Sequence, residues 1–255
     1  MTLSIEFEGQ AFTADGSECH DLSLPFQENG GASAWYVDPM KVSVVRANGF
    51  LGSVKEGGAV NFRDVTFNPH GNGTHTECVG HITPEAHSVN DHPIPPLMPC
   101  LVISIEPESW NDDRRITSNQ IQACCAQHWS ESLPLPPALI IRTMPNAENK
   151  RSKNWSNTNP PYFQADALGM LAARGVDHLL VDLPSVDREV DGGALAAHHA
   201  FWSYPEAPRL GCTISEFLYV PKLVPDGRCL LNLQVAPFAL DAAPSRPLIF
   251  PCPTL

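Results

Sequence analysis

The 255-residue sequence has no apolar run that approaches the ~20 residues of a membrane-spanning helix. Residues 1–8 lack both the basic start and the apolar core of a secretory signal. The eight cysteines form no CxxC pair and no regular framework, which favours reduced thiols. We therefore expect a cytoplasmic protein that has no membrane partner.

Positive charge is also scarce. Lysine and arginine number 16 against 28 acidic residues, so the formal net charge is -12. This balance argues against nucleic acid as a partner. The hydrophobic content of 43% is typical of a globular chain, and no internal repeat is present. At this length one α/β domain can bury a substantial core, and we expect residues 1–255 to form a single domain.

Apolar runs and breakers predict alternating strands and helices. Strands are expected at 42–47, 61–67, 101–105, 138–143 and 176–181, and later at 216–220, 230–236 and 247–250. Helices are expected at 118–128 and from Pro161 to Gly175. Asp226-Gly227 is expected to form a tight turn between the strands at 216–220 and 230–236. Residues 138–181 read strand, loop, helix, strand, which indicates a βαβ unit and a partly parallel sheet.

One short segment, residues 68–81 (NPHGNGTHTECVGH), concentrates groups that bind metals. Alternate residues of an extended strand face the same way, so His75 and Glu77 are expected to project together. Imidazole nitrogen and carboxylate oxygen are common ligands of Zn²⁺ and Mn²⁺. Taken by itself, the segment fits a polar loop with incidental histidines equally well.

A second cluster lies downstream, at Ala197-His198-His199 and Glu216. Neighbouring helical residues point in different directions, so at most one of the two histidines is expected to face a shared site. Glu216 lies beside apolar strand residues, where an unpaired charge would be costly. Its partner is either an arginine or a metal ion, and the upstream cluster favours the ion.

These motifs resemble the cyclase family, which includes bacterial kynurenine formamidases (arylformamidases), isatin hydrolases and polyketide cyclases. Gly73-Thr74-His75-x-Glu77-x-x-x-His81 is similar to the family signature H-x-G-T-H-x-D-x-P-x-H. Further similar motifs follow in the same order: LIIRT at 139–143, RGV at 174–176, VDLPSVD at 181–187, and AHH at 197–199 with Glu216.

The resemblance implies a swivelling β/α/β fold with a mixed sheet and flanking helices. It also implies hydrolysis of a carbon–nitrogen bond with one or two divalent ions, Zn²⁺ first and Mn²⁺ as the alternative. His75 and Glu77 would be ligands, and Glu77 would bridge to a second ion held by His198 and Glu216. His81 would be the general acid/base. Family members also suggest a homo-oligomer, either a dimer or a tetramer.

The sequence departs from the signature at three positions, since the first histidine, the aspartate and the proline align with Gly71, Glu77 and Val79. The first signature histidine aligns with Gly71, while His70 lies one residue too early; on a regular strand this slip would turn His70 to the opposite face, unless a bulge restores its direction. The signature aspartate is Glu77, which is one methylene longer. Cys78, next to Glu77, is a further candidate for the site, as a ligand, a reactive thiol or a packing residue. Its expected position on the opposite face favours packing.

Three functions are compatible with these residues. The first is an arylformamidase-like amidohydrolase (EC 3.5 class) that acts on a small amide or cyclic amide. In it, the metal activates water and His81 transfers protons, since the ordinary pKa of an imidazole is about 6.5; His81 as a further metal ligand is the alternative. The second is a lactone hydrolase, cyclase or dehydratase. The third is a non-catalytic member whose metal site has decayed at Gly71.

Overall fold

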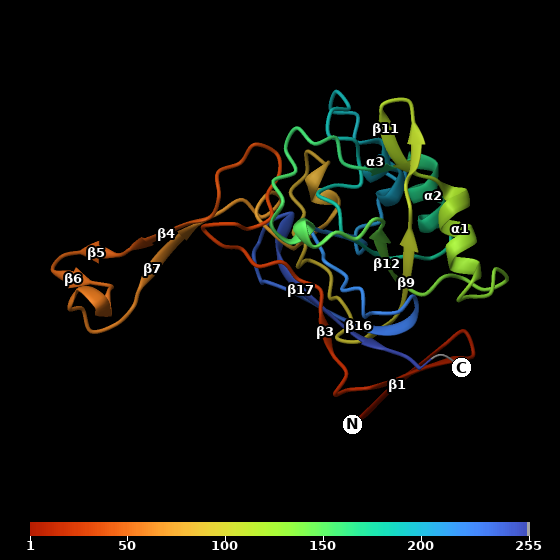
Figure 1. Cartoon of the computed structure of the whole chain (residues 1–255), viewed down its shortest axis with the longest axis horizontal. Helices are drawn as coiled ribbons and strands as arrows, with labels where there is room; N and C mark the ends of the chain where they lie inside the picture. Colours follow the sequence, from red (N-terminus) through yellow and green to blue (C-terminus); the bar gives the residue numbers. More distant parts are fainter. Residues whose placement is uncertain (254–255) are drawn as a thin grey trace.

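The computed structural model describes residues 1–253, and its centre is a closed β-barrel (Figure 1). The strands follow the order β16-β9-β12-β14-β15-β8-β17, and pairing of β17 with β16 closes the barrel. The bounds are β8 (His75–Glu77), β9 (Met98–Ile105), β12 (Ala138–Thr143), β14 (His178–Val181), β15 (Thr213–Glu216), β16 (Gly227–Val235) and β17 (Ala242–Pro251). A short strand, β3 (His20–Asp21), pairs with Leu248 and Ile249 of β17, beyond the part of β17 that pairs with β8.

The sheet is mixed. β9, β12, β14 and β15 run parallel to one another, whereas β8, β16 and β17 pair with their neighbours in antiparallel fashion. The helices flank one side of the barrel: α1 (Ser118–Ala126), α2 (Ala165–Ala173) and α3 (Ala196–Trp202). The mixed α/β architecture with flanking helices is therefore confirmed, and so is the βαβ unit, because α2 connects the parallel strands β12 and β14.

The parallel strands are buried on both faces, as their continuous apolar character predicts. Side chains such as Leu139 and Ile141 pack outward against the helices, where Leu168 and Phe201 lie in the same apolar cluster. The alternate side chains, such as Ile140, fill the barrel interior in a separate cluster. The helices therefore cover the outer face of the parallel strands.

A long arm extends from the barrel, at the left of Figure 1. It contains β4 (Lys41–Val44), β5 (Arg46–Ala47), β6 (Phe50–Leu51), η1 (Val54–Glu56) and β7 (Arg63–Thr66). The strands expected at 42–47 and 61–67 are thus present in outline, but they pair only within the arm and do not join the barrel.

The remaining elements surround the barrel. They are the hairpin β1 (Thr2–Phe7) and β2 (Gln10–Asp15), the small sheet of β10 (Glu108–Trp110), β11 (Asp113–Ile116) and β13 (Tyr162–Phe163), and the short helices η2 (Val79–His81) and η3 (Glu148–Ser152). Among the helices within residues 1–253, none combines the length and the apolar character needed to cross a membrane. All eight cysteines have free thiols.

Two local expectations are wrong. The strand expected at 216–220 in fact ends at Glu216, because Phe217 has a left-handed backbone (φ 56°) that no strand can continue. Asp226-Gly227 does not join a hairpin, since β16 pairs with β9 and β17. Instead, the Asp226 carboxylate accepts hydrogen bonds from the Ser104 amide and hydroxyl and from Arg142.

Candidate metal centre

Three of the expected ligands come from two paired strands. His75 and Glu77 lie on β8, and Glu216, the last residue of β15, is the direct register partner of His75. Their side chains project from the outer face of the barrel toward α3, because Thr76 and Ser215 face the other way and hydrogen-bond to each other at 2.7 Å. His75 Nε2 is 3.5 Å from the Glu216 carboxylate, so the two distant chain segments do converge.

His70 reaches the same cluster from a turn rather than from a strand. The Asn68 side chain accepts a hydrogen bond from the Gly71 amide, and the Asn72 side chain accepts one from the Asn68 amide, which holds the turn. His70 Nδ1 lies 3.0 Å from Glu77 Oε2. The alternation argument therefore does not apply, and of the two directions that the sequence leaves open for His70 the structure shows the one toward the cluster.

Gly71, which aligns with the first histidine of the signature, lies where a side chain would be crowded. A Cβ atom there would lie 2.5 Å from a methyl carbon of Val37 and 3.1 Å from the Ala34 carbonyl oxygen. A larger residue would require Val37 to move, and the neighbouring residue supplies the imidazole instead.

His198 on α3 faces the cluster, whereas His199 does not. His198 Nδ1 is 2.5 Å from Asp187 and its Nε2 is 3.0 Å from Glu77 Oε1. Asp187 also accepts hydrogen bonds from the amides of Ala197 and His198 at the start of the helix. The Nδ1 atom of His199 is 3.1 Å from the Tyr204 carbonyl oxygen, away from the cluster.

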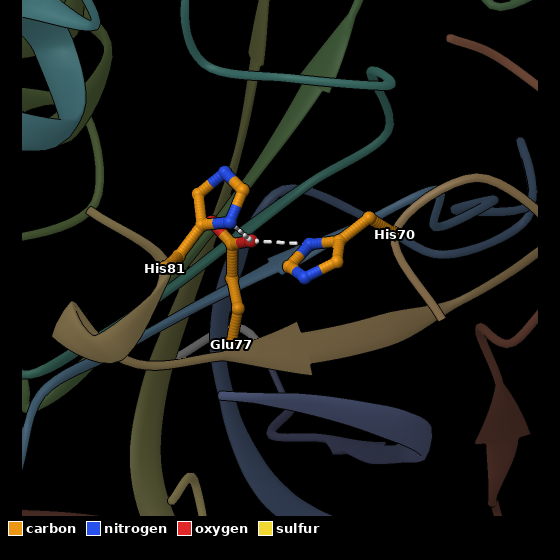
Figure 2. A group of neighbouring side chains, drawn as sticks. All are labelled: His70, Glu77 and His81. Atoms are coloured by element: carbon orange, nitrogen blue, oxygen red, sulfur yellow. Dashed lines mark ion pairs between the residues drawn. The ribbon is translucent and has the colours of Figure 1, made fainter. Parts of the chain in front are cut away.

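His81, from η2, completes the group. Its Nδ1 is 3.9 Å from Glu77 Oε2, and its ring stacks on that of His70 with centroids 4.4 Å apart. Figure 2 shows the imidazoles of His70 and His81 approaching the same carboxylate oxygen of Glu77 from two sides. The His81 side chain is 29% exposed, in contrast to the fully buried Glu77.

Asp241 belongs to the cluster but was missed by the sequence reasoning. It immediately precedes β17, and its carboxylate is 2.9 Å from His70 Nε2 and 3.6 Å from His81 Nδ1. No motif marks it, because it reaches the site only through the pairing of β17 with β8. A loop aspartate before a strand carries no signal of this kind in a single sequence.

Two buried atoms of the cluster, His75 Nε2 and Glu77 Oε2, are hydrogen-bond acceptors in crowded surroundings. His75 Nδ1 donates to the Gly73 carbonyl oxygen at 3.1 Å, which leaves a lone pair on Nε2. This atom is buried and has no hydrogen-bond partner, and the buried Glu77 Oε2 has only His70 Nδ1, 3.0 Å away, within reach as a donor. Such a gathering is costly unless a cation lies between the acceptors.

The pKa values reflect this crowding of charge. Burial raises the pKa of Glu216, and the neighbouring Glu77 carboxylate raises it further. Burial also raises the pKa of Glu77, but the surrounding imidazoles, His81 first, outweigh it and hold the pKa well below its usual range. Burial lowers the pKa of His70 and His198, yet hydrogen bonds to Asp241 and Asp187 respectively raise each to about 10.

The ligand-type atoms fall into two groups that share Glu77. The atoms of His70, Glu77 and His81 lie within 4.8 Å of one another, and so do those of His75, Glu77 and Glu216. These imidazole nitrogens and carboxylate oxygens are suitable ligands for a divalent ion. A divalent ion would be stabilised in the second group, because His75 Nε2 there has no hydrogen-bond partner.

A cavity of about 220 Å³ opens onto the cluster. Trp35, Arg188 and Leu195 line it together with the imidazoles. Five other aromatic side chains do not line this cavity, and all but Tyr162 are buried in the core: Trp155, Tyr162, Phe163, Phe201 and Trp202.

Cys78 points away from the cluster, as expected of a packing residue. It is buried against Val89 and Ala243, and its thiol donates weakly to the His87 carbonyl oxygen at 3.6 Å. Burial raises the pKa of the thiol to about 11, so it is protonated at neutral pH.

Comparison with known proteins shows that the fold resembles those of several solved structures. It matches a structure described as an isatin hydrolase bound to the product analogue thioisatinate, with a TM-score of 0.68, 14% identity, and coverage of 92% of this chain and 93% of that one. A predicted metal-dependent hydrolase from Bacillus stearothermophilus matches with a TM-score of 0.59, 21% identity, and coverage of 91% and 97%.

A third structure, described as a "potential metal-dependent hydrolase with cyclase activity", matches with a TM-score of 0.61, 20% identity, and coverage of 91% and 96%. At these identities the likeness establishes the fold. The sequence itself matches the family model described as "Putative cyclase" over residues 20–188, which is more than half of the chain. The protein therefore belongs to the cyclase family.

Proposed function

We propose that the protein is a metal-dependent hydrolase that cleaves the carbon–nitrogen bond of a small amide or cyclic amide, in the manner of an arylformamidase. The observation that carries this proposal is the convergence of buried ligand-type atoms around Glu77, among them His75 Nε2, which has no hydrogen-bond partner. Fold relatives described as isatin hydrolase and metal-dependent hydrolases support it.

The proposed ligands are His70, His75, Glu77, His198 and Glu216, with Glu77 shared between two ions. The two groups that share Glu77 support four of these ligands and also contain His81. His198 lies outside both groups, and its support is the 3.0 Å approach of its Nε2 to Glu77 Oε1. Zn²⁺ is the first candidate for these nitrogen and oxygen donors and Mn²⁺ the second. When bound, a divalent ion supplies Lewis acidity, which polarises a carbonyl group and lowers the pKa of water.

The chain's own residues would orient the ligands and move the proton. Asp187, at 2.5 Å from His198 Nδ1, leaves Nε2 of that ring directed at Glu77. Asp241 has the same relation to His70, since it binds Nε2 and leaves Nδ1 directed at Glu77.

His81 is the proposed general acid/base, because it lines the cavity and is the most exposed imidazole of the cluster. In the proposed reaction water adds to the carbonyl carbon and the C–N bond breaks. His81 would accept the proton of the attacking water and return it to the leaving nitrogen, giving a carboxylate and an amine.

The test is a substrate panel of N-formyl aryl amines, isatin-like lactams and lactones, assayed before and after chelation. We expect turnover of an amide or lactam that is lost with chelator and restored by Zn²⁺ or Mn²⁺. His81→Ala is expected to lower kcat about 10²- to 10⁴-fold while retaining metal, and His92→Ala, at an exposed position, serves as the control. Full turnover by metal-free protein would refute the proposal.

Activity confined to lactones would favour the second function, a lactone hydrolase, cyclase or dehydratase that uses the same ion. A protein without metal or turnover would favour the non-catalytic alternative. The intact convergence of His75, Glu77, His198 and Glu216 argues against a decayed site.

We also propose that the protein forms a homo-oligomer through its arm. Five apolar side chains of the arm are 44–57% exposed: Phe50, Val54, Val60, Phe62 and Val65. A hairpin of this kind is marginal unless it packs against something. Residues 41–66 carry four basic and two acidic side chains, so the arm is at +2 while the rest of the chain is at -14, which favours docking on a second copy.

Light scattering after size-exclusion chromatography tests this interface. The double variant Phe50→Ser/Phe62→Ser is expected to be smaller than the unmodified protein in solution. Leu223→Ser, which changes a 71% exposed side chain outside the arm, is the matched control. A monomeric unmodified protein would contradict the proposal. The cytoplasmic location expected from the sequence stays a prediction.

A further inference from the structure

A second cavity, of about 140 Å³, lies beside the metal centre but is separate from it. It opens at the carboxyl ends of the parallel strands β12 and β14, where Thr143 ends one strand and Asp182 follows the other. Ligands of α/β sheets commonly bind at this edge. Leu183 lines this cavity and Ser185 lines the one at the metal centre, so the intervening short segment forms the wall between them.

The cavity collects positive charge in a strongly acidic protein. Arg114, Lys150 and Lys153 line it, three of only 16 basic side chains in the chain, and none of the lining residues is acidic.

Lys150 is fully engaged in holding the base of this cavity. Its ammonium group donates to the Thr143 carbonyl oxygen at 2.6 Å, to the Thr143 hydroxyl at 2.8 Å and to Asp182 at 2.8 Å. These bonds account for its three protons. Lys150 therefore contributes structure and local charge, and the capacity to bind a ligand rests on the other two cations.

Arg114 and Lys153 have no such partner. Within residues 1–253, neither forms an ion pair or a side-chain hydrogen bond. The Lys153 ammonium lies 4.0 Å from the centre of the Trp155 ring. Burial lowers the pKa of Lys153, and the charges of Arg114 and Lys150 lower it further, whereas the Glu189 carboxylate offsets part of the shift; the cations therefore repel one another. An anion between them would reverse this repulsion.

The remaining walls are apolar. Trp155, Pro161 and Leu183 are buried residues that line the cavity, and Met144 and Pro145 lie on the same rim. A volume of 140 Å³ is too small for a nucleotide but suits a small ring or short chain. A flat carboxylate can accept two hydrogen bonds from a guanidinium group, and an ammonium group can add a third.

We propose that this cavity is a binding site for a small organic carboxylate, whose charged end lies between Arg114 and Lys153 and whose apolar part packs on Trp155. The site is independent of the metal centre and of the reaction proposed for it.

The test is calorimetric titration of the full-length, metal-loaded protein with sodium benzoate. We expect saturable binding of one benzoate per chain at this cavity, about tenfold weaker or more in Lys153→Met and in Arg114→Met, because each variant removes a charge-assisted hydrogen bond. Lys222→Met removes the same charge at an exposed position outside the cavity and should bind like the unmodified protein. Benzamide, which has the same shape without the charge, should not bind.

Benzoate could also bind at a metal ion, and Glu216→Gln separates the two sites. Binding that persists in Glu216→Gln and weakens in Lys153→Met supports the proposal. Binding that is lost in Glu216→Gln and unchanged in Lys153→Met belongs to the metal centre and overturns it. The proposal is also overturned if benzoate shows no saturable binding or if benzamide binds equally well. It is overturned as well if Lys153→Met and Arg114→Met weaken the binding of inorganic phosphate but not that of benzoate.

Discussion

Replacing Glu216 by glutamine should strengthen the metal-free fold while weakening metal binding. Glu216 Oε1 accepts a hydrogen bond from the Val186 amide at 3.0 Å, which keeps the oxygen of the amide on that side. The new NH₂ group then faces His75 Nε2, 3.5 Å from the present Oε2 position. A buried acceptor that lacks a donor would gain one, and a carboxylate beside Glu77 would be lost.

The size of the effect follows from the cost of an unsatisfied buried acceptor, about 1–3 kcal/mol. Because the 3.5 Å separation must shorten for a good hydrogen bond, the lower end applies. We expect Glu216→Gln to raise the free energy of unfolding of the chelated protein by about 1 kcal/mol at pH 8. Metal affinity should fall about 100-fold or more, since even residues that only orient a ligand contribute 10- to 100-fold.

Urea denaturation in the presence of chelator measures the first quantity, and competition with a chromophoric chelator measures the second. Asp182→Asn is the matched control, since Asp182 is also buried but receives donors from Thr143 and Lys150. An amide facing those donors should destabilise the fold. If Glu216→Gln destabilises the metal-free protein as much as Asp182→Asn does, then it is wrong that His75 Nε2 lacks a hydrogen-bond donor in the absence of metal.

Asp241→Asn should lower metal affinity about 10- to 100-fold in a competition titration, with little loss of stability, because Asp241 orients His70 from the half-exposed rim. Removing metal that is present at 100 times its Kd should lower the unfolding free energy by about 2.7 kcal/mol in urea titrations, and no change would argue against binding to the native state. Burial lowers the pKa of His178 from 6.5 to about 4, so the unfolded state binds more protons than the folded state between these two pH values. The stabilisation that is present above pH 6.5 is therefore lost as the pH falls, and the free energy of unfolding, relative to that of His178→Gln, should drop by about 2 kcal/mol between pH 7 and pH 5. Parallel pH profiles of the two proteins would contradict this.

The parts of the fold that follow from local pattern could be predicted from the sequence. The buried strands at 101–105, 138–143 and 176–181 were expected from their continuous apolar runs, and all three are in the barrel, although the last begins only at His178. The helix that follows Pro161 was expected as well, but it begins at Ala165, because Tyr162–Phe163 pairs with β11 instead.

The ligand candidates were within reach because their motifs combine residue type with order. His75, Glu77, His198 and Glu216 come together as the resemblance implied. The direction of His70 was out of reach, because it depends on a turn held by asparagine side chains and on the space that Val37 takes from residue 71.

Features made by long-range pairing were also out of reach. Asp241 enters the site through β17, and the strands of the arm look like ordinary barrel strands in sequence. Alternation of apolar and polar residues tells which face of a strand is buried, but it does not say against which partner.

The place of β8 between β15 and β17 has a consequence for the order of folding. Thr76 and Ser215 face each other across this junction although 139 positions separate them in the chain. Closing so long a loop has a large entropic cost, and the chain must offset it before the imidazole of His75 and the carboxylate of Glu216 become neighbours. An ion cannot nucleate such a chain; it can only lock a barrel that has already closed, so its arrival should be the last event of assembly and its loss the first of disassembly.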